Sequence, residues 1–149
     1  MRIVVIGAGK VGKKIAERLL DENHDITVVD NDPARLNALI GTHDIMSVQG
    51  NGAIYDVQME AGVDKADVII AATPDDEVNM LCCALAKKIG AGRCIARVRN
   101  PEYYRQLDYM KDELGLSMTV NPEFAAANEM TRLLVLPAAA QVEVFANGR

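Results

Sequence analysis

RIVVIGAGKVG, residues 2–12, is the stretch that decides the fold of this 149-residue chain. Arg2–Ile6 is short, apolar and rich in β-branched residues, which is typical of a buried parallel strand. A glycine pattern G-x-G-x-x-G follows at residues 7–12, and apolar residues at helical spacing then predict a helix over residues 11–22. A strand, a glycine loop and a helix in this order predict a nucleotide-binding α/β unit.

Each glycine of the loop has a physical task. Gly7 permits the tight turn, Gly9 lets a pyrophosphate approach the backbone, and Gly12 lets the helix pack closely on the strand. Free N–H groups of the loop, including that of Val11, lie at the positive end of the helix dipole and are expected to receive phosphates. Lys10 is placed to reach a terminal phosphate. A glycine-rich turn that binds no ligand is the alternative interpretation.

An acidic residue follows at the expected place. Asp30 ends the next predicted strand, Asp25–Asp30, 23 residues after Gly7. Its carboxylate is expected to accept hydrogen bonds from ribose hydroxyls and to repel a 2′-phosphate, since like charges about 4 Å apart cost roughly 1–4 kcal/mol. Asn31 follows it, and Arg35 is expected to be a solvated helix residue. NAD(H), ADP or ATP are therefore preferred to NADP.

Strand-like and helix-like segments alternate through the rest of the chain. Further strands are predicted at residues 44–48, 68–72, 93–98 and 117–120, and further helices at 33–39, 53–61, 75–89, 101–114 and 122–134. Four prolines, each preceded by a good N-cap residue, mark helix starts: Asp32-Pro33, Thr73-Pro74, Asn100-Pro101 and Asn121-Pro122. This order predicts an α/β fold, a Rossmann-like doubly wound parallel sheet of about six strands with a C-terminal crossover helix.

More candidate ligand residues stand at the carboxyl ends of these strands, where open α/β sheets bind ligands. Asn51 and Gly52 follow the third strand and are expected beside the adenine edge. Ala72 and Thr73 follow the fourth strand and are expected to line the phosphates or the second ribose, with the nicotinamide near Thr73 and Asn79. Thr73 acting only as a helix N-cap has equal weight.

Two arginines come at the end of the fifth strand. Arg97 and Arg99 are two residues apart, so they project to the same side of the strand. They either balance ligand phosphates or form a solvated edge pair, and the sequence does not decide between these readings.

Composition excludes several classes of function. The net charge of −5, without a basic stripe, argues against nucleic-acid binding. No apolar run reaches the ~18 residues that span a bilayer, and no signal peptide is expected. Cys82, Cys83 and Cys94 lack disulfide or zinc spacing and are expected to be buried in a reducing compartment. Because His24 and His43 each stand alone, no metal site is predicted from them.

The carboxyl-terminal part differs from the rest. We expect one Rossmann domain over residues 1–140, with residues 141–149 as a linker or the start of a truncated second lobe that opens with a strand at 142–145. The helix from Pro122 to Leu134 carries an apolar face. That face either forms a homodimer or packs on the chain's own sheet.

The segments VIGAGKVG, TVVD, AATPDDEVNML, IARVRNPEY and NPEFAAANEM together resemble the N-terminal lobe of RCK domains, also called KTN or TrkA-N domains. The resemblance implies a cytosolic regulator of Trk/Ktr-type potassium uptake or of a potassium channel, which binds NAD(H), ATP or ADP without turning it over. It also implies pairing through the helix from Pro122 to Leu134, and rings that act on a membrane transporter or channel subunit at the inner face of the cell membrane. Lys10 matches a position where some relatives carry Arg against the terminal phosphate, and Glu123 matches a glutamate near a divalent ion at the dimer interface of some members.

An enzyme is the competing hypothesis, namely the cofactor domain of an NAD-dependent oxidoreductase. Hydride transfer needs a substrate pocket and usually a proton-transfer group near the nicotinamide. Neither histidine follows a strand beyond the third, and Tyr103-Tyr104 lacks a nearby Lys partner. The sequence therefore favours a ligand-gated regulatory domain over an enzyme.

Overall fold

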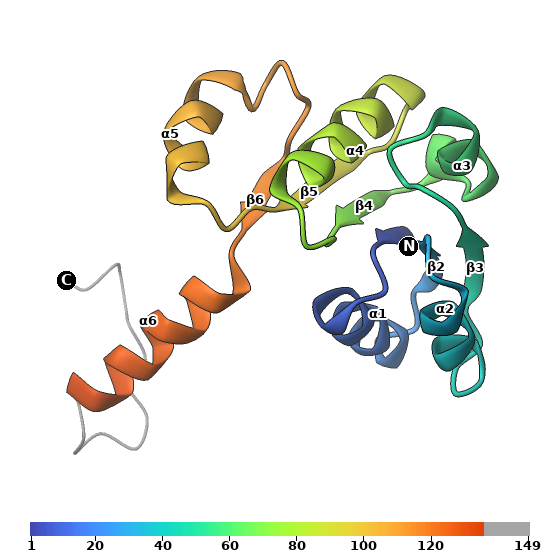
Figure 1. Cartoon of the computed structure of the whole chain (residues 1–149), viewed down its shortest axis with the longest axis horizontal. Helices are drawn as coiled ribbons and strands as arrows, with labels where there is room; N and C mark the ends of the chain where they lie inside the picture. Colours follow the sequence, from blue (N-terminus) through green and yellow to red (C-terminus); the bar gives the residue numbers. More distant parts are fainter. Residues whose placement is uncertain (136–149) are drawn as a thin grey trace.

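The computed structural model describes residues 1–135, which form a six-stranded sheet flanked by helices (Figure 1). The strands are β1 Arg2–Ile6, β2 Asp25–Asp30, β3 Met46–Gln49, β4 Val68–Ala71, β5 Arg93–Arg97 and β6 Met118–Val120. Every pairing is parallel, in the order β3-β2-β1-β4-β5-β6. The predicted Rossmann-like doubly wound sheet is therefore confirmed, and its order reverses between β1 and β4.

Helices connect the strands as predicted, with small shifts of their ends. They are α1 Lys10–Asp21, α2 Pro33–Ile40, α3 Tyr55–Glu60, α4 Asp76–Ile89, α5 Pro101–Met110 and α6 Pro122–Val135, and a short 3₁₀ helix, η1 Val63–Lys65, was not predicted. Gly62, at φ 76°, makes the turn between α3 and η1. The third strand begins two residues later than predicted, because its pairing starts at Met46 opposite Thr27.

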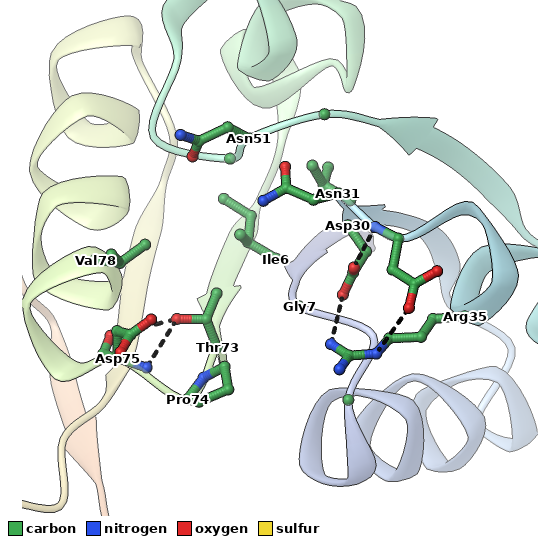
Figure 2. A pocket seen from close by; sticks show the side chains of 15 residues that line it. Ile6, Gly7, Asp30, Asn31, Arg35, Asn51, Thr73, Pro74, Asp75 and Val78 are labelled. Atoms are coloured by element: carbon green, nitrogen blue, oxygen red, sulfur yellow. Dashed lines mark hydrogen bonds and ion pairs between the residues drawn. The ribbon is translucent and has the colours of Figure 1, made fainter.

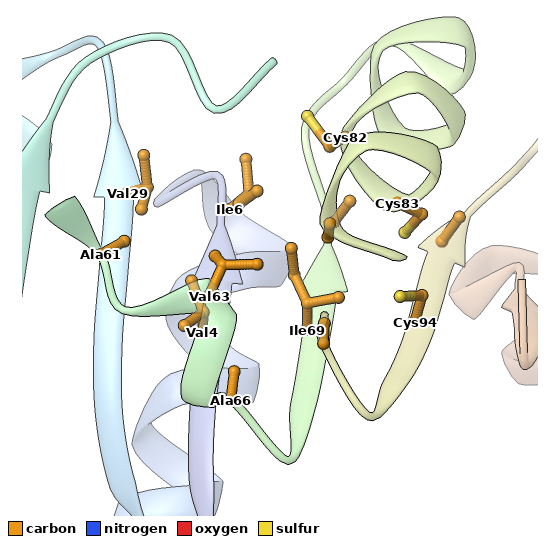
Figure 3. Close-up of a cluster of buried hydrophobic side chains, with 14 of the residues drawn as sticks. Val4, Ile6, Val29, Ala61, Val63, Ala66, Ile69, Cys82, Cys83 and Cys94 are labelled. Carbon is orange, nitrogen blue, oxygen red and sulfur yellow. The ribbon is translucent and has the colours of Figure 1, made fainter. Parts of the chain in front are cut away.

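The sheet buries side chains on both faces. Along β1, Ile3 and Val5 point to the face covered by α1 and α2, while Val4 and Ile6 point to the face covered by α3 and α4 (Figure 1). Figure 3 shows the second of these clusters, in which Ile69 of β4 is fully buried. Such two-sided burial explains why the strands read as continuous apolar runs rather than as alternating ones.

The three cysteines are part of this core. Cys82 and Cys83 lie on α4 and Cys94 on β5, and all three are fully buried (Figure 3). Burial raises the pKa of the Cys82 thiol to about 12 and that of the Cys83 thiol further still. At neutral pH these thiols are therefore neutral packing groups, as the sequence predicted.

Three of the four prolines expected at helix starts are confirmed. Pro33, Pro101 and Pro122 are the first residues of α2, α5 and α6. The prediction was wrong at Pro74, because α4 has Asp75 as its N-cap and begins at Asp76. Thr73 is therefore not an N-cap, and its side chain is used in another way, described below.

Helix α6 extends away from the sheet (Figure 1). None of its residues is buried, and Phe124, Met130, Leu133 and Leu134 are each 60–80% exposed. The alternative that its apolar face packs on the chain's own sheet is therefore wrong. Within residues 1–135 no helix is long and apolar enough to cross a membrane. The predicted strand at 142–145 and the second lobe at 141–149 lie outside the described residues.

Candidate functional site

A cavity of about 290 Å³ opens at the carboxyl ends of the strands, at the point where the strand order reverses (Figure 2). Loops after four strands contribute to its wall. The lining residues are Ile6, Gly7, Gly9, Val29, Asp30, Asn31, Asp32, Arg35, Gly50, Asn51, Gly52, Thr73, Pro74, Asp75 and Val78. Open α/β sheets bind ligands at this position.

The glycine loop forms the floor of the cavity between β1 and α1. The Gly7 N–H donates to the Val29 carbonyl oxygen over 2.7 Å, and the Ala8 N–H donates to Asp30 Oδ2 over 2.6 Å. Gly7 has φ 102°, and a Cβ there would lie 3.0 Å from the backbone of Ala72. The turn is therefore tight on both sides, as its first glycine predicted.

The first turn of α1 has its N–H groups available for a ligand. Gly9 is the N-cap residue, so no side chain can cap the helix, and the first turn contains no acidic residue. The other two helices that start beside the cavity differ, because Asp32 caps α2 through the Ala34 N–H, and α4 has Asp76 and Glu77 in its first turn. Unpaired N–H groups at the positive end of a helix dipole are a binding site for phosphate.

Asp30 ties the ends of β1 and β2 together. Besides the bond from Ala8, its Oδ1 accepts from the Asp32 N–H over 2.8 Å, and only 9% of the residue is exposed. Arg35, half exposed on the first turn of α2, lies 3.8 Å from Asp30 Oδ2 and 3.5 Å from Asp32 Oδ2. The expectation that Arg35 is only a solvated helix residue was wrong, because its guanidinium forms one wall of the cavity (Figure 2).

Thr73 faces Asp30 across the cavity (Figure 2) and is held by the buried Asn79. Asn79 Oδ1 accepts from both the Thr73 N–H and the Thr73 hydroxyl, each over 2.8 Å. Its Nδ2 donates to the carbonyl oxygens of Thr73, over 3.0 Å, and of Arg97, over 2.8 Å. Asn79 was expected near a nicotinamide, but it is fully buried and instead joins the loop after β4 to β5.

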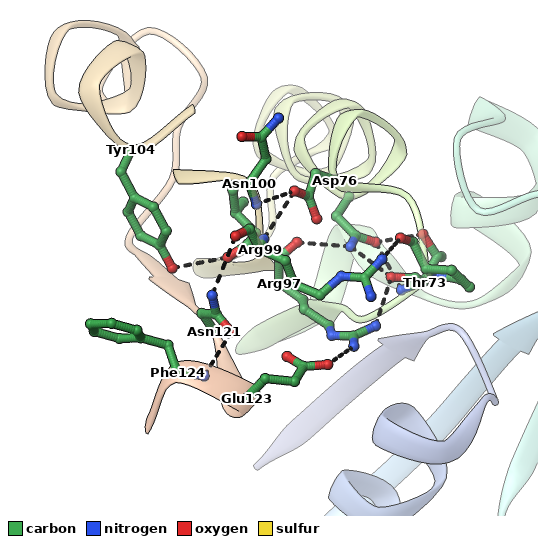
Figure 4. Close-up of polar contacts among 12 residues, drawn as sticks. Thr73, Asp76, Arg97, Arg99, Asn100, Tyr104, Asn121, Glu123 and Phe124 are labelled. Carbon is green, nitrogen blue, oxygen red and sulfur yellow. Dashed lines mark hydrogen bonds and ion pairs between the residues drawn. The ribbon is translucent and has the colours of Figure 1, made fainter. Parts of the chain in front are cut away.

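Arg97, the last residue of β5, and Arg99, two residues after it, support the same loop (Figure 4). Arg97 is buried, donates to the Thr73 carbonyl oxygen over 3.3 Å, and pairs with Glu123 Oε1 over 2.6 Å. Arg99 is exposed and donates to the carbonyl oxygen of Pro74 over 2.5 Å. They project to one side as predicted, but the solvated edge pair was wrong, since Arg97 is a buried link between Thr73 and α6.

Glu123 is the second residue of α6. The pKa of its carboxyl lies below its ordinary value, chiefly because its own backbone N–H donates to it and also because Arg97 pairs with it. Among residues 1–135 no group of three His, Cys, Asp or Glu side chains is arranged to hold a metal ion. The divalent-ion role of Glu123 stays a prediction, which would need ligands from another subunit.

The structure brings seven of the sequence-predicted residues to the cavity wall: Gly7, Gly9, Asp30, Asn31, Asn51, Gly52 and Thr73. Six do not line it: Lys10, Val11, Gly12, Ala72, Arg97 and Arg99. Lys10 and Val11 begin α1, and Gly12 and Ala72 are buried behind the loop. Arg35 and Val78 were missed, because helix residues reach the cavity only through the way their helices dock, and Asp32, the N-cap of α2, was assigned only as a helix start.

The cavity suits an extended nucleotide. The N–H groups of α1 can receive phosphates, Asp30 lies where ribose hydroxyls would be recognised, and Val29 and Ile6 provide apolar walls. The ionisable side chains that line it are Asp30, Asp32, Asp75 and Arg35, so it contains no His, Cys, Lys or Tyr from the described residues. The geometry therefore supports the binding of an extended polar ligand.

Comparison with known proteins identifies relatives over the same residues. The family model described as the TrkA-N domain matches residues 3–122. The Trk system potassium uptake protein TrkA of Haemophilus influenzae is 39% identical over 152 residues, covering 100% of this chain and 33% of the relative. A TrkA homolog of Archaeoglobus fulgidus is also 39% identical, over 149 residues, covering 100% of this chain and 34% of that protein. The chain thus spans about a third of the length of these relatives.

Solved structures agree with the fold. The TrkA-N domain of the inner membrane protein ybaL from Escherichia coli superposes with a TM-score of 0.78 at 23% identity, covering 89% of this chain and 96% of that one. A crystal structure of GsuK bound to ADP superposes with a TM-score of 0.70 at 25% identity, covering 89% of this chain and 33% of that one.

Proposed function

The chain belongs to the TrkA-N domain family, and from this premise we propose that it is a nucleotide-binding regulatory domain of a potassium uptake system. NAD(H), ADP or ATP would bind in the cavity at the carboxyl ends of the strands and would not be turned over. A membrane potassium transporter or channel subunit would be the partner, which places the domain at the inner face of the cell membrane. Relatives are named as Trk potassium uptake proteins, and the similar GsuK structure contains ADP.

One observation carries the proposal: the uncapped start of α1 and the carboxylate of Asp30 lie on the wall of the same cavity. The N–H groups at the start of α1 would bind the phosphates, and the Asp30 carboxylate would bind the ribose that follows them along the nucleotide. Among the residues described, no His, Lys, Tyr or Cys lines the cavity, which favours regulation over the oxidoreductase alternative.

Titration calorimetry of the purified chain with NAD, NADH, ADP and ATP tests this function. Saturable binding of at least one nucleotide is expected, with no oxidation of NADH when candidate oxo-acids are added. Asp30→Ala is expected to weaken binding about 10- to 150-fold, because hydrogen bonds to a charged group contribute about 1.5–3 kcal/mol.

Asp108→Ala is the matched control, since it removes an equal charge from the exposed side of α5. Its affinity should equal that of the wild-type chain. Equal affinities for both variants would remove Asp30 from the site, and turnover of NADH would restore the oxidoreductase hypothesis.

Helix α6 would form the interface between two copies of the chain. Its exposed apolar side chains, among them Phe124, Met130 and Leu134, form a surface of the kind that monomeric proteins rarely expose. We expect homodimers through the helix from Pro122 to Leu134 and a ring in a full-length protein. Arg97 would couple the two functions, because it contacts the cavity residue Thr73 and pairs with Glu123 at the start of α6.

Arg97→Met is expected to leave nucleotide binding intact and to abolish the change in dimer shape that follows it. Nucleotide affinity should change less than about threefold, because Arg97 does not line the cavity and the substitution leaves no buried charge behind. Small-angle scattering with and without ADP should show a change of dimer shape for the wild-type chain and none for Arg97→Met.

Arg105→Met provides the control, because it removes an equal charge from the exposed side of α5, away from both the cavity and α6. It should respond to ADP like the wild-type chain. Glu123→Gln tests the same link from its exposed side, and a full response in both Arg97→Met and Glu123→Gln would show that coupling runs elsewhere.

A further inference from the structure

Asp30, Asp32 and Arg35 form one corner of the cavity, where the carboxylates accept backbone hydrogen bonds and the guanidinium donates none within residues 1–135. Three carboxylate oxygens there are occupied by backbone N–H groups: Asp30 Oδ2 by Ala8, Asp30 Oδ1 by Asp32, and Asp32 Oδ1 by Ala34. These bonds measure 2.6–2.9 Å and fix both carboxylates in place. Each of these oxygens keeps a second lone pair, so the carboxylates are held in position and can still accept a hydrogen bond from a ribose hydroxyl.

The N–H donors of Arg35, in the same corner, remain available to a ligand. The Arg35 guanidinium has five N–H donors in a planar fork. It approaches Asp30 and Asp32 only at ion-pair distances of 3.8 and 3.5 Å, and within residues 1–135 it makes no hydrogen bond. Its side chain is 49% exposed and lines the cavity. This corner therefore offers a ligand a cationic donor beside its carboxylate acceptors.

We infer that Arg35 forms an anion subsite for a phosphate at the 2′ position of the adenosine ribose, so that the chain accepts NADP as well as NAD. The inference rests on the proposed nucleotide function. Asp30 and Asp32 would both repel the dianionic group, but the guanidinium beside them reduces that repulsion and can donate two parallel hydrogen bonds to phosphate. The chain should therefore discriminate against NADP less strongly than Asp30 alone led us to expect from the sequence.

Calorimetric titration with NAD and NADP tests the subsite, because these two ligands differ only in the 2′-phosphate. For the wild-type chain we expect dissociation constants within about tenfold of each other, as Arg35 offsets one of the two nearby carboxylates. Arg35→Gln should weaken NADP binding by about tenfold or more and NAD binding by less than about threefold, since only the phosphate uses the charge-assisted bonds.

Two further variants sharpen the result. Arg18→Gln removes an equal charge from the exposed last turn of α1 and should change neither affinity. Arg35→Lys keeps the charge without the planar fork and should give an intermediate NADP affinity. Thermal unfolding of each variant should stay close to that of the wild-type chain, because Arg18 is exposed, and Arg35 is half exposed and makes only ion pairs of 3.5 and 3.8 Å.

The outcomes separate the two hypotheses. If the wild-type chain binds NAD but no NADP, or if Arg35→Gln weakens both ligands equally, the subsite is refuted and the proposed function stands. If neither NAD, NADP nor ADP binds the wild-type chain, the proposed function fails and the subsite fails with it.

Discussion

Gly12→Ala is expected to destabilise the chain by about 3 kcal/mol or more, because there is no space for a methyl group at this position. A Cβ on Gly12 would lie 1.7 Å from the Gly7 carbonyl oxygen and 2.8 Å from the Gly7 carbonyl carbon. Both are backbone atoms of the tight loop, so no side-chain rotation can relieve the overlap. Thermal unfolding should show a Tm lower by roughly 6–12 °C for a domain of this size.

Gly9→Ala should leave stability nearly unchanged and weaken nucleotide binding. No atom lies within 4 Å of a Cβ at Gly9, and its φ of −70° suits alanine, so the free energy of unfolding should change by less than about 0.5 kcal/mol. The new methyl group, however, would stand where phosphates are expected, and calorimetry should find nucleotide binding reduced at least about tenfold. A Gly9→Ala chain that binds normally would place the phosphates elsewhere, and a stable Gly12→Ala chain would contradict the close packing of α1.

Asn79→Ala should lower the free energy of unfolding by about 2–4 kcal/mol. The substitution leaves the part-buried Thr73 N–H and the Arg97 carbonyl oxygen, whose bond is buried, without their partner, and each such orphaned group costs about 1–3 kcal/mol. Because Thr73 lines the cavity, nucleotide affinity should fall as well, even though Asn79 itself touches no ligand.

Asn37→Ala is the control for this prediction. Asn37 lies on the exposed side of α2, where alanine is a good helix residue, so its stability should stay within about 0.5 kcal/mol of the wild-type value. Urea unfolding of the two variants measures the difference. Similar stabilities would mean that water enters the Asn79 site and replaces the lost bonds.

The glycine loop and the aspartate could be read from sequence because their roles depend on local backbone geometry. The turn at Gly7, the exposed helix start at Gly9 and the carboxylate at Asp30 all follow from a strand, a turn and a helix in fixed order. The doubly wound parallel sheet of about six strands was also predicted, since strands and helices alternate along the chain and the apolar runs indicate burial on both faces.

Other features depend on how elements distant in the chain dock together. Thr73-Pro74 looked like a helix start, yet the Asn79 side chain takes up the Thr73 N–H and hydroxyl, and the helix begins later. Arg97 looked like an edge residue until Glu123, 26 residues further along, paired with it.

Sequence alone therefore determined the sheet, the glycine loop and the family resemblance, because these are encoded by short-range patterns of apolar residues and glycine. Only the tertiary structure decided that Arg35 stands beside Asp30, that Arg97 joins the cavity wall to α6, and that α6 leaves its apolar face exposed. Side-chain pairs of this kind are set by the angles and distances at which helices pack on the sheet. Those angles arise from the whole core, so no local pattern records them.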